Sequence, residues 1–144
     1  MKLRLSFNVS GENFNTQLCI ERLYSNELKA EYDVDCPNHL SWVHPDEFTD
    51  YRDYESRSAY EKAYLDFIIT NINILDRCGA DDFSIFTEIY IQADEQCNFE
   101  TLSEGFYPYI WKYTIRMPTS VYICDEEGGC AQDFLLTNLK SDIS

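Results

Sequence analysis

Basic residues are scarce in this sequence of 144 residues. Eleven lysines and arginines stand against 26 aspartates and glutamates, which gives a formal net charge of −15. Such a surplus repels the phosphates of nucleic acids and anionic membrane surfaces, and it attracts basic proteins. The composition therefore argues against a protein that binds nucleic acid directly, and it favours a basic protein as the partner.

Long apolar runs are also missing. The longest uncharged stretch of the central apolar segment, FIITNINIL, is too short to cross a bilayer. No apolar core of signal-peptide length follows Lys2 and Arg4. We therefore expect no membrane association and a soluble protein of the cytoplasm. In that compartment the six cysteines stay reduced and act as small apolar residues or free thiols.

The common catalytic motifs do not occur. The chain has no G-x-S-x-G elbow, no H-E-x-x-H helix, no Walker sequence and no glycine-rich phosphate loop. Its 26 carboxylates offer too many pairs to select a couple of the glycosidase type. The sequence therefore predicts a protein that is not an enzyme, without catalytic residues, metal ligands or a cofactor.

One cluster keeps an enzymatic alternative open. Cys36, His39 and His44 stand as C-x2-H-x4-H, and zinc takes these ligand types. A structural zinc site usually needs a second pair of ligands, which the sequence does not provide. A cysteine nucleophile paired with either histidine is a further option. The alternative function is thus a small metal- or thiol-dependent enzyme; in the other interpretation the histidines are loop residues and Trp42 is a core anchor.

Apolar periodicity predicts a single α+β domain over residues 1–144. Residues 3–9 alternate apolar and polar side chains, which is typical of a half-buried strand. Residues 83–93 are expected to form a central strand, because apolar side chains lie on both of its faces. Residues 60–75 carry apolar side chains at helical spacing, and Ser58 with Glu61 has the spacing of a capping box. The predicted fold is one compact domain with a mixed or antiparallel sheet of about four or five strands and a long amphipathic helix, 58–78, packed on one face.

The shorter elements are less clearly marked. Asn15 can cap a short helix, and Gly105 with Pro108 weakens the helical pattern that surrounds them. At least one of the two segments that precede the long helix is expected to be a strand. These expected elements are a helix over 16–24, strands over 28–34, 39–43 and 120–125, an ambiguous segment over 102–113, and an apolar stretch FLLTNL that could dock on the core.

Three stretches carry a resemblance to known proteins. They are LSFNVSGENFNTQLCIERL at the start, SWVH before the long helix, and NFETLSEGFYPYIWKYTIRMPTSVYI near the end. Together they resemble a family of small bacterial proteins known only as a domain of unknown function. The resemblance implies a compact α+β domain and brings no catalytic residues. In class, this small acidic chain is also similar to the immunity proteins that neutralise secreted bacterial toxins.

Negative charge is concentrated along the chain. Residues 27–55 hold nine acids against two bases, and residues 81–104 hold seven acids and no base. Within HPDEFTDYRDYE, residues 44–55, aromatic residues recur every third position among the acids. If this segment is helical, carboxylates steer a basic partner toward rings that add contact area and attract cations. In the other interpretation the tyrosines face the core and the acids only solvate the surface.

These observations lead to a functional prediction. The chain is expected to be a protein-binding module with a basic partner. Its most concrete form is an immunity-type inhibitor that covers the active site of a basic toxin such as a nuclease, whose site must be positive to hold phosphates. The candidate partner-binding residues are Asp46, Glu47, Asp50, Tyr51, Asp53, Tyr54 and Glu55.

Overall fold

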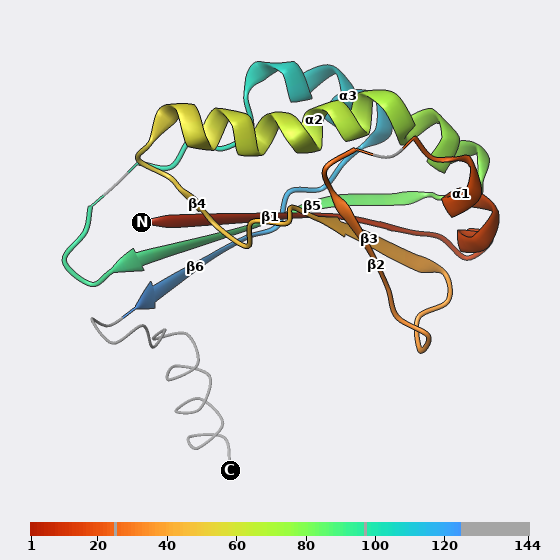
Figure 1. The fold of residues 1–144 in the computed structure, drawn as a ribbon, viewed down its shortest axis with the longest axis horizontal. Coiled ribbons are helices and arrows are strands. Elements are labelled where there is room, and N and C mark those ends of the chain that lie inside the picture. The colour runs from red at the N-terminus through yellow and green to blue at the C-terminus, as the bar shows by residue number, and fades with distance from the viewer. Residues whose placement is uncertain (25, 97, 125–144) are drawn as a thin grey trace, which may run out of the picture.

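A computed structural model gives the structure of the protein and describes residues 1–24, 26–96 and 98–124. These residues form one sheet, with α2 and α3 on the same side of it (Figure 1). The predicted α+β class is confirmed. The elements are β1 (Lys2–Ser10), α1 (Thr16–Arg22), β2 (Lys29–Tyr32), β3 (His39–Val43), β4 (Thr49–Asp50), α2 (Tyr54–Arg77), β5 (Asp82–Gln92), the 3-10 helix η1 (Glu104–Phe106), α3 (Tyr107–Tyr113) and β6 (Thr119–Cys124).

The sheet is mixed and has β1 at its centre. Its strand order is β2-β3-β1-β5-β6, and the short β4 also pairs with β1. All pairs are antiparallel except β5 with β6. A parallel pair needs a crossover, which residues 93–118 provide with η1 and α3. The mixed sheet agrees with the prediction, and its sixth strand is the two-residue β4, which the sequence did not reveal.

The core lies between the sheet and α2. Alternate residues of β1 point into it and are fully buried: Leu3, Leu5, Phe7 and Val9. At its centre the ring of Phe67 on α2 lies 4.8 Å from the ring of Trp42 and 6.1 Å from that of Phe7. Burial of this apolar surface is the main force that holds the helix on the sheet.

The long helix begins four residues earlier than predicted. Asp53 is its N-cap, and the Asp53 carboxylate accepts a hydrogen bond from the backbone N–H of Ser56. The predicted capping box of Ser58 and Glu61 is therefore wrong, because both residues lie inside the helix. The other end agrees with the predicted range 58–78, since the helix ends at Arg77. Gly79 follows with a φ of 100°, a conformation that favours glycine.

Both segments with a weak strand signal are strands, since β2 and β3 form an antiparallel pair. The ambiguous segment contains α3, in which Pro108 takes one of the first two positions. A proline is tolerated there because the first backbone N–H groups of a helix have no partner within it. Thr114 ends α3 in the left-handed conformation, with a φ of 53°.

Three remaining expectations concern α1, β6 and the end of the chain. Asn15 caps α1 as predicted, with its side chain accepting from the N–H of Leu18 at 3.1 Å. The predicted last strand corresponds to β6, whereas the apolar stretch FLLTNL lies outside the described residues. Over the ranges that the structure describes, no helix is both long enough and apolar enough to span a membrane.

Candidate binding site

The chain leaves the sheet between β3 and β4, and this departure creates the candidate site. On one side, β1 pairs with β3 over residues 6–10 and with β4 over residues 2–3. Residues 44–48 connect these two strands outside the ladder. Among the described strands, residues 4–5 of β1 therefore have no partner on this side.

Two tyrosines of α2 take the place of the missing strand. The N–H of Leu5 donates to the Tyr60 hydroxyl at 3.2 Å, and the Leu5 carbonyl accepts from the Tyr64 hydroxyl at 2.5 Å. The Tyr64 hydroxyl also accepts from the N–H of His44 at 2.8 Å, and the Tyr60 hydroxyl donates to the Glu47 carbonyl at 3.3 Å. Burial raises the pKa of both phenols, so they keep their protons.

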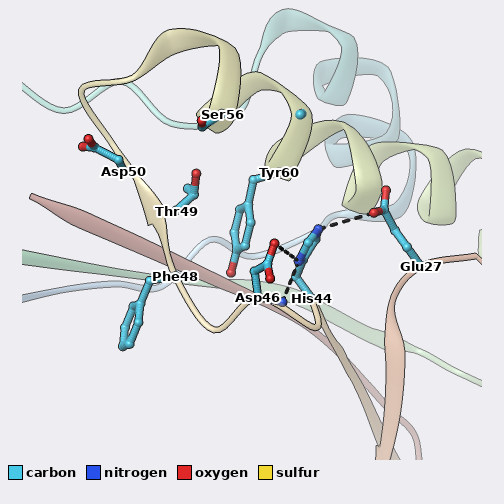
Figure 2. A pocket seen from close by; sticks show the side chains of 9 residues that line it. Glu27, His44, Asp46, Phe48, Thr49, Asp50, Ser56 and Tyr60 are labelled. Atoms are coloured by element: carbon cyan, nitrogen blue, oxygen red, sulfur yellow. Dashed lines mark hydrogen bonds and ion pairs between the residues drawn. The ribbon is translucent and has the colours of Figure 1, made fainter.

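An open pocket of about 440 Å³ lies between this connecting segment and the first half of α2 (Figure 2). Its walls carry three carboxylates, one imidazole, aromatic rings and small hydroxyls. No lysine or arginine is among its lining residues. These are Glu27, His44, Asp46, Phe48, Thr49, Asp50, Ser56, Ala59 and Tyr60.

His44 links two of the carboxylates across the pocket. Its side chain is only 10% exposed, and its ring packs against Tyr60 with centroids 4.7 Å apart. Nδ1 accepts from the backbone N–H of Asp46 at 2.9 Å, so the proton of the neutral ring is on Nε2. Nε2 lies 3.5 Å from the Glu27 carboxylate, and Nδ1 lies 3.8 Å from the Asp46 carboxylate (Figure 2). The imidazole thus lies between carboxylates of two separate segments, and its Nε2–H faces that of Glu27.

Glu27 is the site residue that the sequence analysis missed. It joins the pocket because β2 and β3 are antiparallel, which places the residues before β2 beside those after β3. The register pairs Lys29 with Val43, so position 27 lies opposite position 45. The neighbouring Asn26 donates to the Ala63 carbonyl on α2 at 3.0 Å, which fixes the backbone next to Glu27. Pairing the two candidate strands in the sequence would have found this acid.

The predicted acidic residues divide between three places. Asp46 and Asp50 line the pocket. Glu47 lies outside it, with its carboxylate 4.0 Å from the guanidinium of Arg4. Asp53 is occupied as the N-cap of α2. Two of the predicted carboxylates therefore line the same pocket as Glu27.

The predicted aromatic strip does not exist as a helical surface. The chain is extended in β4 and becomes helical only at Tyr54, so residues 48, 51 and 54 do not share a helix face. Tyr54 and Glu55 lie in the exposed first turn of α2, where the Tyr54 side chain is 70% exposed. These two residues remain available to a partner next to the pocket.

Tyr51 is a core residue and not part of the surface, because only 5% of it is exposed. Its hydroxyl accepts from the N–H of Glu100 at 2.5 Å and donates to the Glu100 carbonyl at 3.1 Å. The guanidinium of Arg57 lies 4.5 Å from the centroid of its ring. Tyr51 therefore anchors the segment that leads to η1, which corrects its expected place on the contact surface.

Ion pairs reduce the charge of the second acidic stretch. Asp82 makes a bidentate contact with Arg116, at 2.8 and 2.9 Å. The pKa of the Glu95 carboxyl is lowered, chiefly because the backbone N–H of Gln92 donates to it. The N-terminal ammonium and Arg52, whose guanidinium lies 3.1 Å from the Glu95 carboxylate, lower this pKa further. In contrast, the basic side chain beside Glu27 and Asp46 in the pocket is the imidazole of His44, which carries a charge only when both ring nitrogens are protonated. Negative charge therefore concentrates at the pocket.

Cys36, His39 and His44 do not come together. His39 begins β3 and His44 follows its last residue, so roughly 16 Å of extended chain separates them, at about 3.3 Å per residue. Cys36 is exposed in the turn before β3. Within the described ranges, no three His, Cys, Asp or Glu side chains are placed to hold a metal ion. Over the described part of the chain, these three residues therefore do not form a metal site.

The pocket suits a positively charged group. The carboxylates of Glu27, Asp46 and Asp50 can accept hydrogen bonds from an ammonium or a guanidinium, and the faces of aromatic rings attract cations. Because the pocket is open, a side chain of another protein can enter it. Comparison of the chain with protein-family models, curated proteins and solved structures finds no match.

Proposed function

We propose that this protein is a small acidic binding module, an immunity-type inhibitor that binds and neutralises a basic toxin in the cytoplasm. The observation that carries the proposal is that Glu27, Asp46 and Asp50 line one open pocket without a lining lysine or arginine. Such a pocket favours a cationic side chain of a partner, because no lysine or arginine lines it to compete for its carboxylates.

The geometry favours arginine or lysine as the group that enters. A guanidinium can bind two carboxylate oxygens side by side, and it can also lie against an aromatic ring. Phe48 and Tyr60 supply rings at the pocket, and Ser56 and Thr49 supply hydroxyls. The pocket therefore combines charge with apolar contact, the combination found at energetically important positions of protein interfaces.

The net charge of −15 supports a basic partner at long range. A field of this sign speeds the approach of a cationic protein, and the effect weakens as salt is added. A nuclease is a suitable target, because a site that holds phosphates is itself positive.

The proposal is tested with the product of the adjacent gene, since inhibitors are commonly encoded beside their targets. The two purified proteins are mixed at low and physiological salt, and complex formation is measured by calorimetry together with any nuclease activity. We expect a stoichiometric complex that weakens with salt and suppresses the activity of the partner. A panel of cationic bacterial nucleases is tested in the same way. If neither the adjacent gene product nor any of these nucleases is bound or inhibited at low salt, the proposal is wrong.

A further inference from the structure

The strand β2 forms one edge of the sheet, and all four of its residues are exposed (Figure 1). No described strand pairs with its outer side. The N–H and C=O groups along such an edge can pair with an extended segment of another chain. The register with β3 is uninterrupted from Lys29 to Tyr32, so these side chains point to the two faces of the sheet and leave the edge accessible.

A second pocket, of about 160 Å³, lies between α1, α2 and the strands β2 and β3. Its wall is mostly apolar. Trp42 and Phe67 in it belong to the buried core, whereas Ile20, at 47% exposed, and Tyr24 are accessible from solvent. Its lining residues are Ile20, Leu23, Tyr24, Asn26, Leu28, Ala30, Trp42 and Phe67. We call it the apolar pocket.

The apolar pocket adjoins the larger pocket lined by Glu27, Asp46 and Asp50, which we call the acidic pocket. Asn26 and Leu28 line the first, and Glu27 between them lines the second. The buried Asn71 on α2 accepts from the N–H of Tyr24 at 2.8 Å and donates to its carbonyl at 3.0 Å. These hydrogen bonds hold Tyr24, in the wall of the apolar pocket, against α2, the helix that lines both pockets.

The charge around β2 defines the occupant. Residues 27–35 include the acids Glu27, Glu31, Asp33 and Asp35 against Lys29 alone, a local charge of −3. An added strand places alternate side chains on opposite faces of the sheet. A segment that alternates apolar and basic residues therefore matches the apolar pocket on one face and the carboxylates beside it.

We propose that β2 binds an extended segment of the basic partner as an added strand. One apolar side chain of that segment enters the apolar pocket beside Ile20, and a nearby arginine or lysine reaches Glu27. This inference rests on the proposed function, because it specifies how the basic partner is bound. It adds backbone pairing to the charge contacts, and so it explains how an acidic surface can select one partner among many cationic proteins.

The test uses a short synthetic peptide of alternating arginine and valine, blocked at both ends. Amide hydrogen exchange is measured by NMR with and without the peptide, and affinity is measured by calorimetry. We expect the outward-facing amides of β2 to exchange at least about tenfold more slowly in the complex, because strand pairing protects them. Ile20→Ser should weaken binding by about tenfold, because it removes apolar contact area without changing the charge.

The matched control is Ile69→Ser, since Ile69 lies on α2 outside both pockets and is 46% exposed. It should leave the affinity unchanged. Tyr24→Ser replaces Ile20→Ser if the latter fails to fold by circular dichroism. Unprotected β2 amides, or equal affinities for Ile20→Ser and Ile69→Ser, would overturn the added strand.

The same experiment separates this inference from the proposed function. If Asp46→Lys with Asp50→Lys weakens peptide binding and Ile20→Ser does not, the acidic pocket stands and strand addition is wrong. If the wild type does not bind the peptide, or if neither variant alters binding, then both the added strand and the acidic pocket fail as binding sites for this class of ligand. Protection of β2 amides in a dimer of the free protein would identify a second copy as the occupant, and it would overturn the inference.

Discussion

The hydroxyl of Tyr64 donates to the carbonyl of Leu5 at 2.5 Å, across 59 positions of the sequence. The contact is buried, and it satisfies a strand carbonyl at the point where the neighbouring strand is interrupted. The same hydroxyl accepts from the N–H of His44, the first residue of the interruption. A single side chain of the helix therefore holds both sides of the gap from which the acidic pocket is built.

Removing this hydroxyl should destabilise the fold. Tyr64→Phe leaves the buried Leu5 carbonyl without its phenolic donor, and we expect a loss of about 1–3 kcal/mol in the free energy of unfolding. Urea denaturation measures the loss. The control is Tyr54→Phe, at an exposed position of the same helix, which should change stability by less than about 0.5 kcal/mol. Equal stabilities of the two variants would contradict the role given to Tyr64.

Reversing two charges at the pocket should slow association with a basic partner. For Asp46→Lys with Asp50→Lys we expect an association rate about tenfold lower at low salt, and a flatter salt dependence, because the local attraction is lost. Stopped-flow or surface-binding kinetics measure both quantities. Asp53 is left unchanged because it caps α2, so its reversal would mix a folding defect with the charge effect.

The control for this pair carries the same change of net charge elsewhere. Asp76→Lys with Asp81→Lys alters acids at and beyond the far end of α2. It should reduce the rate by much less, because screening limits attraction over that distance. If both double variants slow association equally, only the total charge matters and the pocket is not the docking position.

Glu61 should make stability depend on pH. It is buried on α2 and accepts from the N–H of Leu102 at 2.9 Å, and burial raises its pKa above the ordinary 4.5. A raised folded-state pKa gives stability that is fully present below pH 4.5 and is lost as the pH rises through the folded pKa. Compared with Glu61→Gln, the wild type should therefore lose stability between acid and neutral pH.

Urea denaturation of both proteins on either side of pH 4.5 and at pH 7 measures this difference. The control variant is Glu55→Gln, in the exposed first turn of the same helix, which removes one negative charge but no buried carboxyl. Glu61→Ala should be less stable than Glu61→Gln by about 1–3 kcal/mol at pH 7, because the N–H of Leu102 loses its acceptor. A gap between wild type and Glu61→Gln that does not change with pH would count against the assignment.

The start of α2 offers a direct comparison of two capping candidates. Asp53 accepts from the N–H of Ser56 at 3.3 Å and from its hydroxyl at 3.0 Å, whereas Ser58 lies within the helix. Asp53→Ala should lower the free energy of unfolding by about 0.5–2 kcal/mol. Ser58→Ala should have little effect or stabilise the helix slightly, because alanine is the better helix former. If Ser58→Ala destabilised the protein more than Asp53→Ala, Ser58 would be the cap, as expected from the sequence.

Elements with a strong apolar period were predicted from the sequence. The alternation in β1 and β5 and the broad stripe of α2 each reflect burial on one face, and that signal is local. The start of α2 was misplaced because Ser58 and Glu61 have the spacing of a capping box. In the structure Glu61 points to the backbone of Leu102, a contact across 41 positions that no local pattern encodes.

The site was predicted only in part, for a similar reason. The acids at positions 46 and 50 were identified, but their convergence with Glu27 depends on the register of β2 against β3. Tyr51 was predicted to lie on the surface because tyrosine carries both an apolar ring and a polar hydroxyl. Composition alone does not show whether the hydroxyl has a buried hydrogen-bond partner. Its hydroxyl finds a partner in the backbone of Glu100, and this allows the ring to be buried.

The gap closed by tyrosines has a consequence for how this protein can change its specificity. Residues 44–48 are fastened at both ends through peptide groups, and the side chains at positions 45, 46 and 47 are exposed. New side chains at these three positions would change the surface that a binding partner contacts, while the fold stays the same. The loop can therefore be diversified, by selection or by a designer, without rebuilding the domain.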